Sequence, residues 1–288
     1  VRRFTGDGEF LGTIGEGQLR DPRGLDVGFD GTLYVADRNS AIEQFSSTGQ
    51  HTGTWGAPEP FYFEELPDVA VAPDGSVYCV DSDADMIYHY AASGSYLGGW
   101  AAPSPFSIAI ATDGSVYVSS HWMRHIQHYS DAGELLDQWG REGADAGQFD
   151  VPTSIAVGAD GSVYVTESVN RRIQRFSADG AFLGQFGQGF TDAGRFDDIK
   201  GYVTASDGSL YVVDIGGGRV QHLSAEGEFL GKWGHPTDGY WRPVAVALAP
   251  DGSVYVSDTL RRIEHFSFSG EWLNGWEMEG AAGPPRPP

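Results

Sequence analysis

The sequence predicts an all-β fold, a β-propeller made of four-stranded antiparallel blades. Two observations support this prediction. First, the motif Asp-Gly-x-x-Tyr occurs six times, at intervals of 39 to 47 residues, beginning at Asp30, Asp74, Asp113, Asp160, Asp207 and Asp251. Second, each motif joins two short runs of β-branched and aromatic residues, and two further runs follow, which gives four strands per repeat. A repeat of this length with four strands is typical of a propeller blade.

Residues Val151–Gly187 contain the most regular copy of the repeat. Its first, inner hairpin turns at Asp160-Gly161, because an Asp-Gly step supplies the positive φ that tight turns need. Its second, outer hairpin turns at Ser177–Gly180. Proline often stands where the innermost strand begins, where a missing N–H is tolerated, as at Pro22, Pro105, Pro152 and Pro243.

The two ends of the chain raise the question of how the ring closes. Val1–Gly15 matches an outer hairpin with no inner hairpin before it, so the sequence contains seven outer and six inner hairpins. A six-bladed ring is favoured, with either Val1–Gly15 or Ile263–Trp276 completing the last blade, and a seven-bladed ring is the alternative. We expect residues 1–276 to form one domain. Residues 277–288 are rich in Gly and Pro and predict a disordered tail or a linker.

The composition limits the classes of partner. The formal net charge is -22, from 40 acidic and 18 basic side chains. This charge argues against nucleic acids and anionic membranes, because both carry negative charge, and it favours basic partners or divalent ions. No apolar run reaches the ~20 residues that span a bilayer, so we expect a soluble protein without membrane insertion.

The lone Cys79 lies in an apolar run and cannot form an intramolecular disulfide, so we predict a small buried hydrophobic residue. The chain does not begin with Met, and we expect a processed or truncated protein or a part of a larger chain or complex. The compartment stays open on these grounds, with an extracellular or periplasmic location slightly favoured.

The whole pattern resembles the NHL repeat family. Residues Pro152–Gly187 show it best, with Pro-x-x-Ile-Ala-Val, Asp-Gly-Ser-Val-Tyr-Val, an acidic residue, Arg-Ile-Gln-x-Phe and Phe-Leu-Gly-x-Phe-Gly in order. The resemblance covers residues 1–276. It implies a propeller that serves as an interaction platform for protein or RNA, whereas related six-bladed propellers include lyases, lactonases and esterases with a metal at the central channel.

Several residues recur once per blade, and we interpret them as structural. The second strand of each blade ends in Asp37, Asp81, Ser120, Glu167, Asp214 or Asp258. Such residues in neighbouring blades should lie on the order of 10 Å or more apart, too far to share a metal ion, so we predict that the acids accept backbone N–H bonds. The matched histidines of the third strands are predicted to be packed polar residues, namely His89, His128, His222 and His265.

Departures from the repeat are the candidate functional residues. The channel-facing positions of the innermost strands are mostly small, but two of them are Asp26 and Asp68. Arg23 and Lys200 stand at strand starts and could pair with these carboxylates. We therefore consider these four residues a candidate site at the channel mouth, which would suit a metal-assisted hydrolase or lyase.

The loops on one face also depart from the pattern. Asp81–Asp85 resembles the start of a calcium loop but lacks the Gly and the terminal Glu of an EF-hand. His121–His125 places an aromatic residue between polar ones in a turn, which is typical of a contact hot spot, although Trp122 could instead fold over a neighbouring blade. The candidate binding residues on this face are Phe61, Tyr62, Phe63, His121, Trp122, Arg124, His125, Tyr240 and Trp241.

Taken together, these features favour a non-catalytic module that binds a protein or peptide partner, with a basic partner preferred, through the loop face. No Gly-x-Ser-x-Gly motif occurs, and we assign no catalytic residue, no metal ligand and no cofactor, although Ca²⁺ or another divalent ion stays open. RNA binding is disfavoured because basic residues are few. The alternative is a metal-assisted hydrolase or lyase with its site at the channel mouth.

Overall fold

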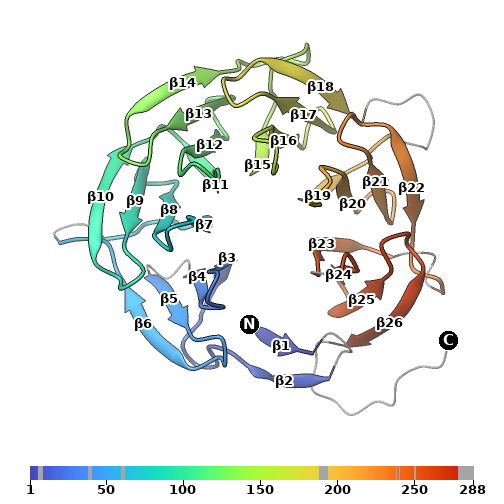
Figure 1. Ribbon diagram of the computed structural model, residues 1–288, viewed down its shortest axis with the longest axis horizontal. Coiled ribbons are helices and arrows are strands. Elements are labelled where there is room, and N and C mark those ends of the chain that lie inside the picture. The colour runs from blue at the N-terminus through green and yellow to red at the C-terminus, as the bar shows by residue number, and fades with distance from the viewer. Residues whose placement is uncertain are drawn as a thin grey trace. The chain divides into compact units, whose positions relative to one another are not determined.

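The computed structural model describes residues 1–5, 9–37, 41–59, 62–187, 194–237, 239, 241–249 and 251–277. All regular elements of these residues are β-strands, and they form six four-stranded antiparallel sheets and one two-stranded sheet (Figure 1). The six four-stranded sheets are the blades of a β-propeller, which confirms the predicted fold class. No helix among the described residues is long and apolar enough to cross a membrane.

The strands of each blade follow one another in chain order. Blades one to three are β3 (Pro22–Val27), β4 (Leu33–Asp37), β5 (Ala41–Phe45), β6 (His51–Trp55); β7 (Asp68–Val71), β8 (Val77–Asp81), β9 (Met86–Tyr90), β10 (Tyr96–Ala101); and β11 (Pro105–Ile110), β12 (Val116–Ser120), β13 (His125–Tyr129), β14 (Leu135–Trp139). Blades four to six are β15 (Pro152–Val157), β16 (Val163–Glu167), β17 (Arg172–Phe176), β18 (Phe182–Phe186); β19 (Ile199–Thr204), β20 (Leu210–Asp214), β21 (Arg219–Leu223), β22 (Phe229–Trp233); and β23 (Pro243–Leu248), β24 (Val254–Asp258), β25 (Arg262–Phe266), β26 (Trp272–Glu277).

The chain divides into two compact units, and each is described by itself. The first comprises Val1, Gly12–Asn170 and Gln174–Leu183. The second comprises Arg2–Leu11, Arg171–Ile173 and the chain from Gly184.

The Asp-Gly turns form as predicted. In blade four, Gly161 has a φ of 79° and its N–H donates to the Gly158 carbonyl over 2.9 Å. The Asp160 carboxylate accepts bonds from the backbone N–H and the hydroxyl of Ser162, both at 2.9 Å. The Asp therefore closes the turn with its side chain while Gly provides the left-handed backbone.

Within each unit, the core lies between successive blades. The second strand is buried along its whole length in blades one to five, as in β8 and β12. Tyr78 and Val80 of blade two pack with Ile108 and Val116 of blade three in one cluster. Because a second strand is covered on both faces, no blade could bury its apolar residues alone.

The N-terminal hairpin, β1 (Arg2–Phe4) and β2 (Phe10–Thr13), forms the separate two-stranded sheet. The last blade receives its outer hairpin from β25 and β26, the C-terminal of the two segments that could supply it. Phe4 packs against Trp276, with ring centroids 5.7 Å apart. Strand β26 extends to Glu277, and the predicted tail beyond it lies outside the described residues.

Candidate functional site

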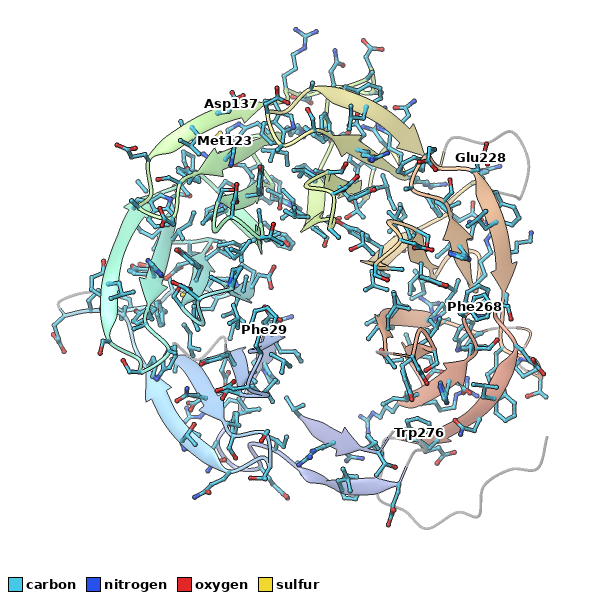
Figure 2. All side chains as sticks on the ribbon, viewed as in Figure 1. Phe29, Met123, Asp137, Glu228, Phe268 and Trp276 are labelled. Carbon is cyan, nitrogen blue, oxygen red and sulfur yellow. The ribbon has the colours of Figure 1, made fainter. Side chains whose placement is uncertain are left out.

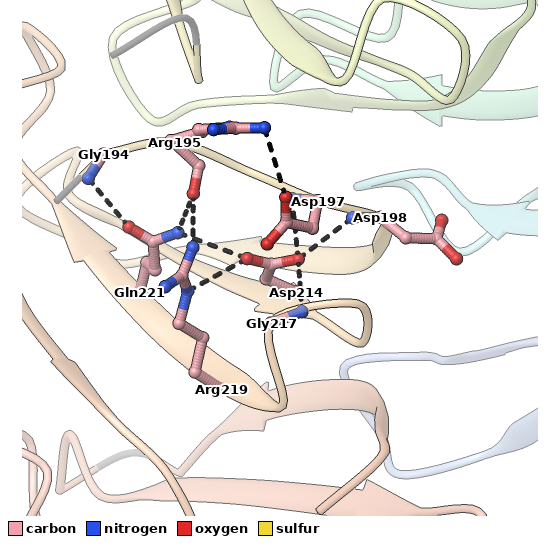
Figure 3. A network of polar contacts seen from close by, with 8 residues as sticks. All are labelled: Gly194, Arg195, Asp197, Asp198, Asp214, Gly217, Arg219 and Gln221. Atoms are coloured by element: carbon pink, nitrogen blue, oxygen red, sulfur yellow. Dashed lines mark hydrogen bonds and ion pairs between the residues drawn. The ribbon is translucent and has the colours of Figure 1, made fainter. Parts of the chain in front are cut away.

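The acid that ends each second strand is structural, as blade five illustrates (Figure 3). The Asp214 carboxylate is buried and accepts bonds from the backbone N–H groups of Asp197 and Asp198, both at 3.0 Å. It also accepts from the Gly217 N–H and from the Arg219 guanidinium. The acid thus fastens the loop before its blade, which confirms the prediction of backbone N–H acceptance.

The corresponding residues of the other blades act in the same way. Asp37, Asp81 and Glu167 accept backbone N–H bonds from the loop before their own blade, and Asp258 accepts them from the turn that follows it. Ser120 of blade three is the exception, because its hydroxyl donates to the Pro103 carbonyl. The buried oxygens of this set are occupied by the fold and are not available to a ligand.

The matched histidines are packed residues, also as predicted. His128 of blade three stacks on Tyr117, its partner across the strands, with ring centroids 4.1 Å apart and planes 7° apart. The same stack occurs at Tyr78/His89, Tyr211/His222 and Tyr255/His265.

The two channel carboxylates connect successive blades of the first unit. Asp26 on β3 accepts a 2.8 Å bond from the Val71 N–H on β7. Asp68 on β7 accepts bonds from the Ser107 hydroxyl at 2.9 Å and the Ile108 N–H at 3.2 Å, both on β11. The innermost strands are therefore linked by side-chain to backbone bonds from blade to blade.

Sequence reasoning missed Ser107. It appeared only as one of the small channel-facing residues, yet its buried hydroxyl also lies 3.4 Å from the Ile155 N–H of blade four. The signal available in the sequence was that Ser107 on β11 and Asp68 on β7 both occupy channel-facing positions of successive innermost strands.

Burial changes the chemistry of the two carboxyls. Burial raises the pKa of Asp68 from its usual 3.8 to about 6, although the bonds from Ile108 and Ser107 oppose the shift. The negative charge of Asp26 raises the pKa of Asp68 further. Burial also raises the pKa of Asp26, against the N–H bonds from Val71 and Val27. Asp68 stays partly accessible, so it is a carboxyl that gains and loses a proton close to neutral pH.

A metal does not fit these two residues. All four carboxylate oxygens accept hydrogen bonds, because the Val27 and Val69 N–H groups occupy the oxygens that face their own strands. Among the described residues, no three His, Cys, Asp or Glu side chains come together as a metal site would require. Arg23 pairs with Asp21, and Lys200 pairs with Asp198, since each basic side chain at the start of its strand reaches the acid two residues before it.

His121 and two aromatic rings form a cluster that includes Phe106, the residue before Ser107 on β11. The Phe106 ring packs on the imidazole of His121, and the Trp122 ring meets that imidazole edge-on, both with centroids 4.8 Å apart. Burial lowers the pKa of His121, opposed by a hydrogen bond with the Pro152 backbone and reinforced by the Arg124 guanidinium. We call Asp26, Asp68, Phe106, Ser107 and His121 the inner rim.

The other loop residues are spread over different surroundings. Trp122 is 71% exposed and does not fold over a neighbouring blade, and Tyr62 is 70% exposed. Phe63 and Trp241 are buried in the core. Phe61 and Tyr240 lie outside the described residues.

Two further predicted residues flank Trp122. Arg124 lies 3.3 Å from Asp150 and 3.5 Å from Glu142 in ion pairs. His125 is half-buried, and burial lowers its pKa against a hydrogen bond with the Met123 backbone. Arg124 acts on the inner rim through its charge, which lowers the pKa of His121.

Solved structures with a similar fold include several lyases. A streptogramin B lyase has a TM-score of 0.75 and 17% identity, covering 90% of this chain and 84% of that one. Virginiamycin B lyase from Staphylococcus aureus gives 0.74 and 19%, covering 89% and 84%. A catalytically inactive variant of the same enzyme with quinupristin gives 0.75 and 18%, covering 90% and 85%. The chain matches no curated protein sequence.

The family match corrects the functional prediction. The family described as the SMP-30/gluconolactonase/LRE-like region matches residues 14–257, and this description does not name NHL repeats. The prediction of a non-catalytic interaction module is wrong, because enzymes are among this family's namesakes and among the similar structures; the hydrolase or lyase alternative agrees better with both. The chain belongs to the SMP-30/gluconolactonase/LRE-like family of β-propellers.

Proposed function

We propose that the protein is an enzyme that opens lactones, which are cyclic esters, at the inner rim of blades one to three. The observation that supports this proposal is the Asp68 carboxyl, which accepts a bond from the Ser107 hydroxyl in a residue that is only partly buried. The substrate class comes from the family, whose description includes gluconolactonase. The solved structures of similar fold include lyases, so we consider elimination beside hydrolysis as the reaction that breaks the ester bond of the lactone.

The chemistry assigned to Asp68 is proton acceptance. With a pKa of about 6, the carboxyl is mostly ionised at neutral pH and is a stronger base than an ordinary aspartate. In hydrolysis, Asp68 takes a proton from water, the water oxygen bonds the ester carbon, and the ring oxygen leaves as an alcohol that receives the proton. In elimination, Asp68 takes a proton from the carbon beside the one that bears the ester oxygen, the bond between that second carbon and the oxygen breaks, and an alkene and a carboxylate form. Asp68 then releases the proton to water.

The charge of the protein suits this substrate class. A lactone is neutral and approaches a protein of net charge -22 without repulsion, whereas the acid product is an anion that the same field repels. Phe106 and Trp122 offer apolar surface next to His121 for the carbon skeleton of the ring.

The test is ring opening by the purified protein across a panel of five- and six-membered lactones, followed by pH titration from pH 4.5 to 8.5. We expect kcat/KM to rise about tenfold per pH unit below pH ~6 and to level off above it, as the base ionises. Asp68→Asn should lower kcat/KM at least ~100-fold and should remove this rise of kcat/KM with pH, which we call the pH limb. Reaction in water enriched in heavy oxygen identifies hydrolysis by label in the acid product.

Asp74→Asn is the matched control, because Asp74 closes the turn at the other end of the same inner hairpin. It should retain the activity and the pH limb. Ring opening that persists in Asp68→Asn with an unchanged limb would exclude Asp68 as the base, and the absence of ring opening for every lactone would overturn the substrate class.

A further inference from the structure

The N-terminal hairpin packs on blade six in the way that an outer hairpin packs on the blade before it. Phe4 of β1 and Trp276 of β26 have ring centroids 5.7 Å apart, and Figure 2 labels Trp276. The same contact links the fourth strand of blade five to the third strand of blade six, where Trp233 and Phe266 are 6.0 Å apart. β1 and β2 therefore pack on blade six as the third and fourth strands of a further blade would.

One edge of β1 has no neighbouring strand among the described residues. On its other edge, the Val1 amino group donates to the Ile14 carbonyl at 2.8 Å, and the Ile14 N–H donates to the Val1 carbonyl at 2.7 Å. Because backbone groups alternate in direction along a strand of an antiparallel pair, those of Arg2 and Phe4 point away from β2. The third strand of each four-stranded blade pairs with a second strand on this edge. In β1 the same groups form a free strand edge.

The face of blade six that a following blade would cover is also open. Five tyrosines of the Asp-Gly-x-x-Tyr motif are at most 4% exposed, namely Tyr34, Tyr78, Tyr117, Tyr164 and Tyr211. The sixth, Tyr255, is only half-buried, and Ala247 opposite it on β23 is exposed. In blade five, Tyr211 packs with Val254 and Val256 of the second strand of blade six. Within the described part of the second unit, no second strand follows blade six to cover Tyr255 in this way.

Arg3 indicates the chemistry of a segment that would fit this edge. The order of residues in β1 matches the third strand of blade four, so Arg3 corresponds to Arg175. The Arg175 guanidinium forms a 2.7 Å ion pair with Asp160 and lies 5.8 Å from the ring centroid of Tyr164, both on the inner hairpin of its own blade. Arg3 is exposed. An inner hairpin with the motif Asp-Gly-x-x-Tyr would supply an equivalent carboxylate and an equivalent ring to Arg3.

We propose that the free edge of β1 and the open face of blade six are a docking site for a partner segment that folds as an inner hairpin of this repeat, with Asp-Gly at its turn and Val-Tyr-Val in its second strand. The bound segment completes the half blade that β1 and β2 form. The site contains no residue of the inner rim and does not depend on the lactone activity.

The register of the complete blades specifies how the segment binds. In blade three the tyrosine of the second strand lies opposite His128, and the valines on either side of it lie opposite the neighbours of His128. The same register on β1 places the tyrosine of the segment opposite Arg3 and its valines opposite Arg2 and Phe4, so that the free backbone groups are paired. The valines then cover Tyr255, as the valines of blade six cover the tyrosine of blade five. Strand pairing, apolar burial and charge therefore favour the same occupant.

The experiment titrates the protein with an acetylated and amidated synthetic peptide of the sequence Pro152–Glu167, the inner hairpin of blade four, at ~0.15 M salt, which screens the net charge. We expect saturable binding with a Kd between ~10 μM and ~1 mM, because the hairpin has to become ordered as it binds. At saturation, hydrogen exchange of the Phe4 amide should slow at least ~10-fold. The Thr5 amide is the internal control, since it already donates to the Glu9 carbonyl at 2.9 Å.

Two variants of β1 test the register. Arg3→Glu should weaken binding of the peptide about threefold to tenfold, because it replaces an ion pair with repulsion. Arg2→Glu is the matched control, since it changes the net charge equally on an exposed neighbour that points to the other face of the strand, and it should keep the affinity within about twofold. Asp160→Asn in the peptide keeps a residue that suits the turn and should remove the difference between the two variants. Unfolding curves check that both variants are folded.

Three results would overturn the proposal. The first is the absence of saturable binding up to ~1 mM peptide. The second is binding that leaves the exchange of the Phe4 amide unchanged or affects Arg3→Glu and Arg2→Glu equally, because the peptide would then bind elsewhere or in another register. The third is dimers of the protein that form without peptide and are displaced by it, which would assign the edge of β1 to a second copy of the chain.

Discussion

Blades three and four have nearly the same backbone pattern, but their buried polar groups are in opposite states. In blade four, Glu167 and Gln174 bind each other and the strap, which is the loop of residues 140–150 before this blade, and each has several partners. In blade three, Ser120 replaces the acid, the strap is missing, and Gln127 Oε1 has no partner among the described residues. Buried polar atoms that satisfy one another stabilise a fold, whereas each unsatisfied one lowers its stability.

The largest expected difference in stability is between variants of Glu167 and Ser120, the residues that end the second strands of blades four and three. Glu167→Ala should lower the free energy of unfolding by about 3–5 kcal/mol, because the Asp150 N–H, Asn170 Nδ2 and Gln174 Nε2 all lose a buried carboxylate acceptor. Ser120→Ala removes one hydroxyl bond and should cost only about 1 kcal/mol. Urea unfolding of the two variants measures the difference, and equal losses would contradict this view of the two blades.

The next prediction reverses sign between the blades. Gln174→Met should destabilise the protein by about 1–3 kcal/mol, since the Gly147 N–H and the Gln148 carbonyl lose their partner. Gln127→Met should be neutral or should stabilise the protein by up to about 1 kcal/mol, because it removes an unsatisfied buried oxygen at nearly constant volume. The same unfolding measurement applies, and a loss at Gln127 as large as at Gln174 would show that Gln127 has a structural partner.

The fold and its repeating structural groups were predictable because both are local properties. The Asp-Gly turn needs only its own residues, as Asp160 and Ser162 illustrate, and the cross-strand stack of Tyr117 and His128 follows from strand register. The role of the second-strand acids was predictable for the same reason, because a buried carboxylate next to a turn has backbone N–H groups within reach.

The candidate sites were only partly predictable, because they depend on contacts between blades. Asp26 and Asp68 stood out from the small residues around them, but their bonds to Val71 and Ser107 join strands about 40 residues apart. The raised pKa of Asp68 comes from burial, which no sequence pattern specifies. The short loop before blade three was visible in the sequence, but its meaning depends on knowing that Gln174 binds the longer strap.

A smaller effect concerns how the free energy of unfolding changes at low pH. Blade three has His128 on its third strand, and blade four has Arg175 at the matching position. Burial lowers the pKa of His128, although the Asp113 and Asp137 carboxylates nearby raise it in part. The folded state thus binds fewer protons than the unfolded state, so the free energy of unfolding decreases as the pH falls through ~6.5, the unfolded value for histidine. Arg175 pairs with Asp160 and stays charged, so it adds no such dependence.

His128→Gln copies Gln44, which stands opposite Tyr34 at the matching position of blade one. The variant should lose less stability than the wild type between pH 8 and pH 5, in unfolding measured at constant salt. His89 and His222, whose pKa values burial also lowers, keep the remaining dependence. An unchanged pH slope would mean that the His128 imidazole is equally easy to protonate in both states.

The smallest effect on stability should come from the exposed turn residues, Trp122 in blade three and Val169 at the matching position of blade four. Both side chains are more than half exposed, so truncation to Ala should change the free energy of unfolding by at most ~0.5 kcal/mol in either blade. Urea unfolding measures both losses, and a loss well above ~0.5 kcal/mol in either variant would show that its side chain packs against the fold.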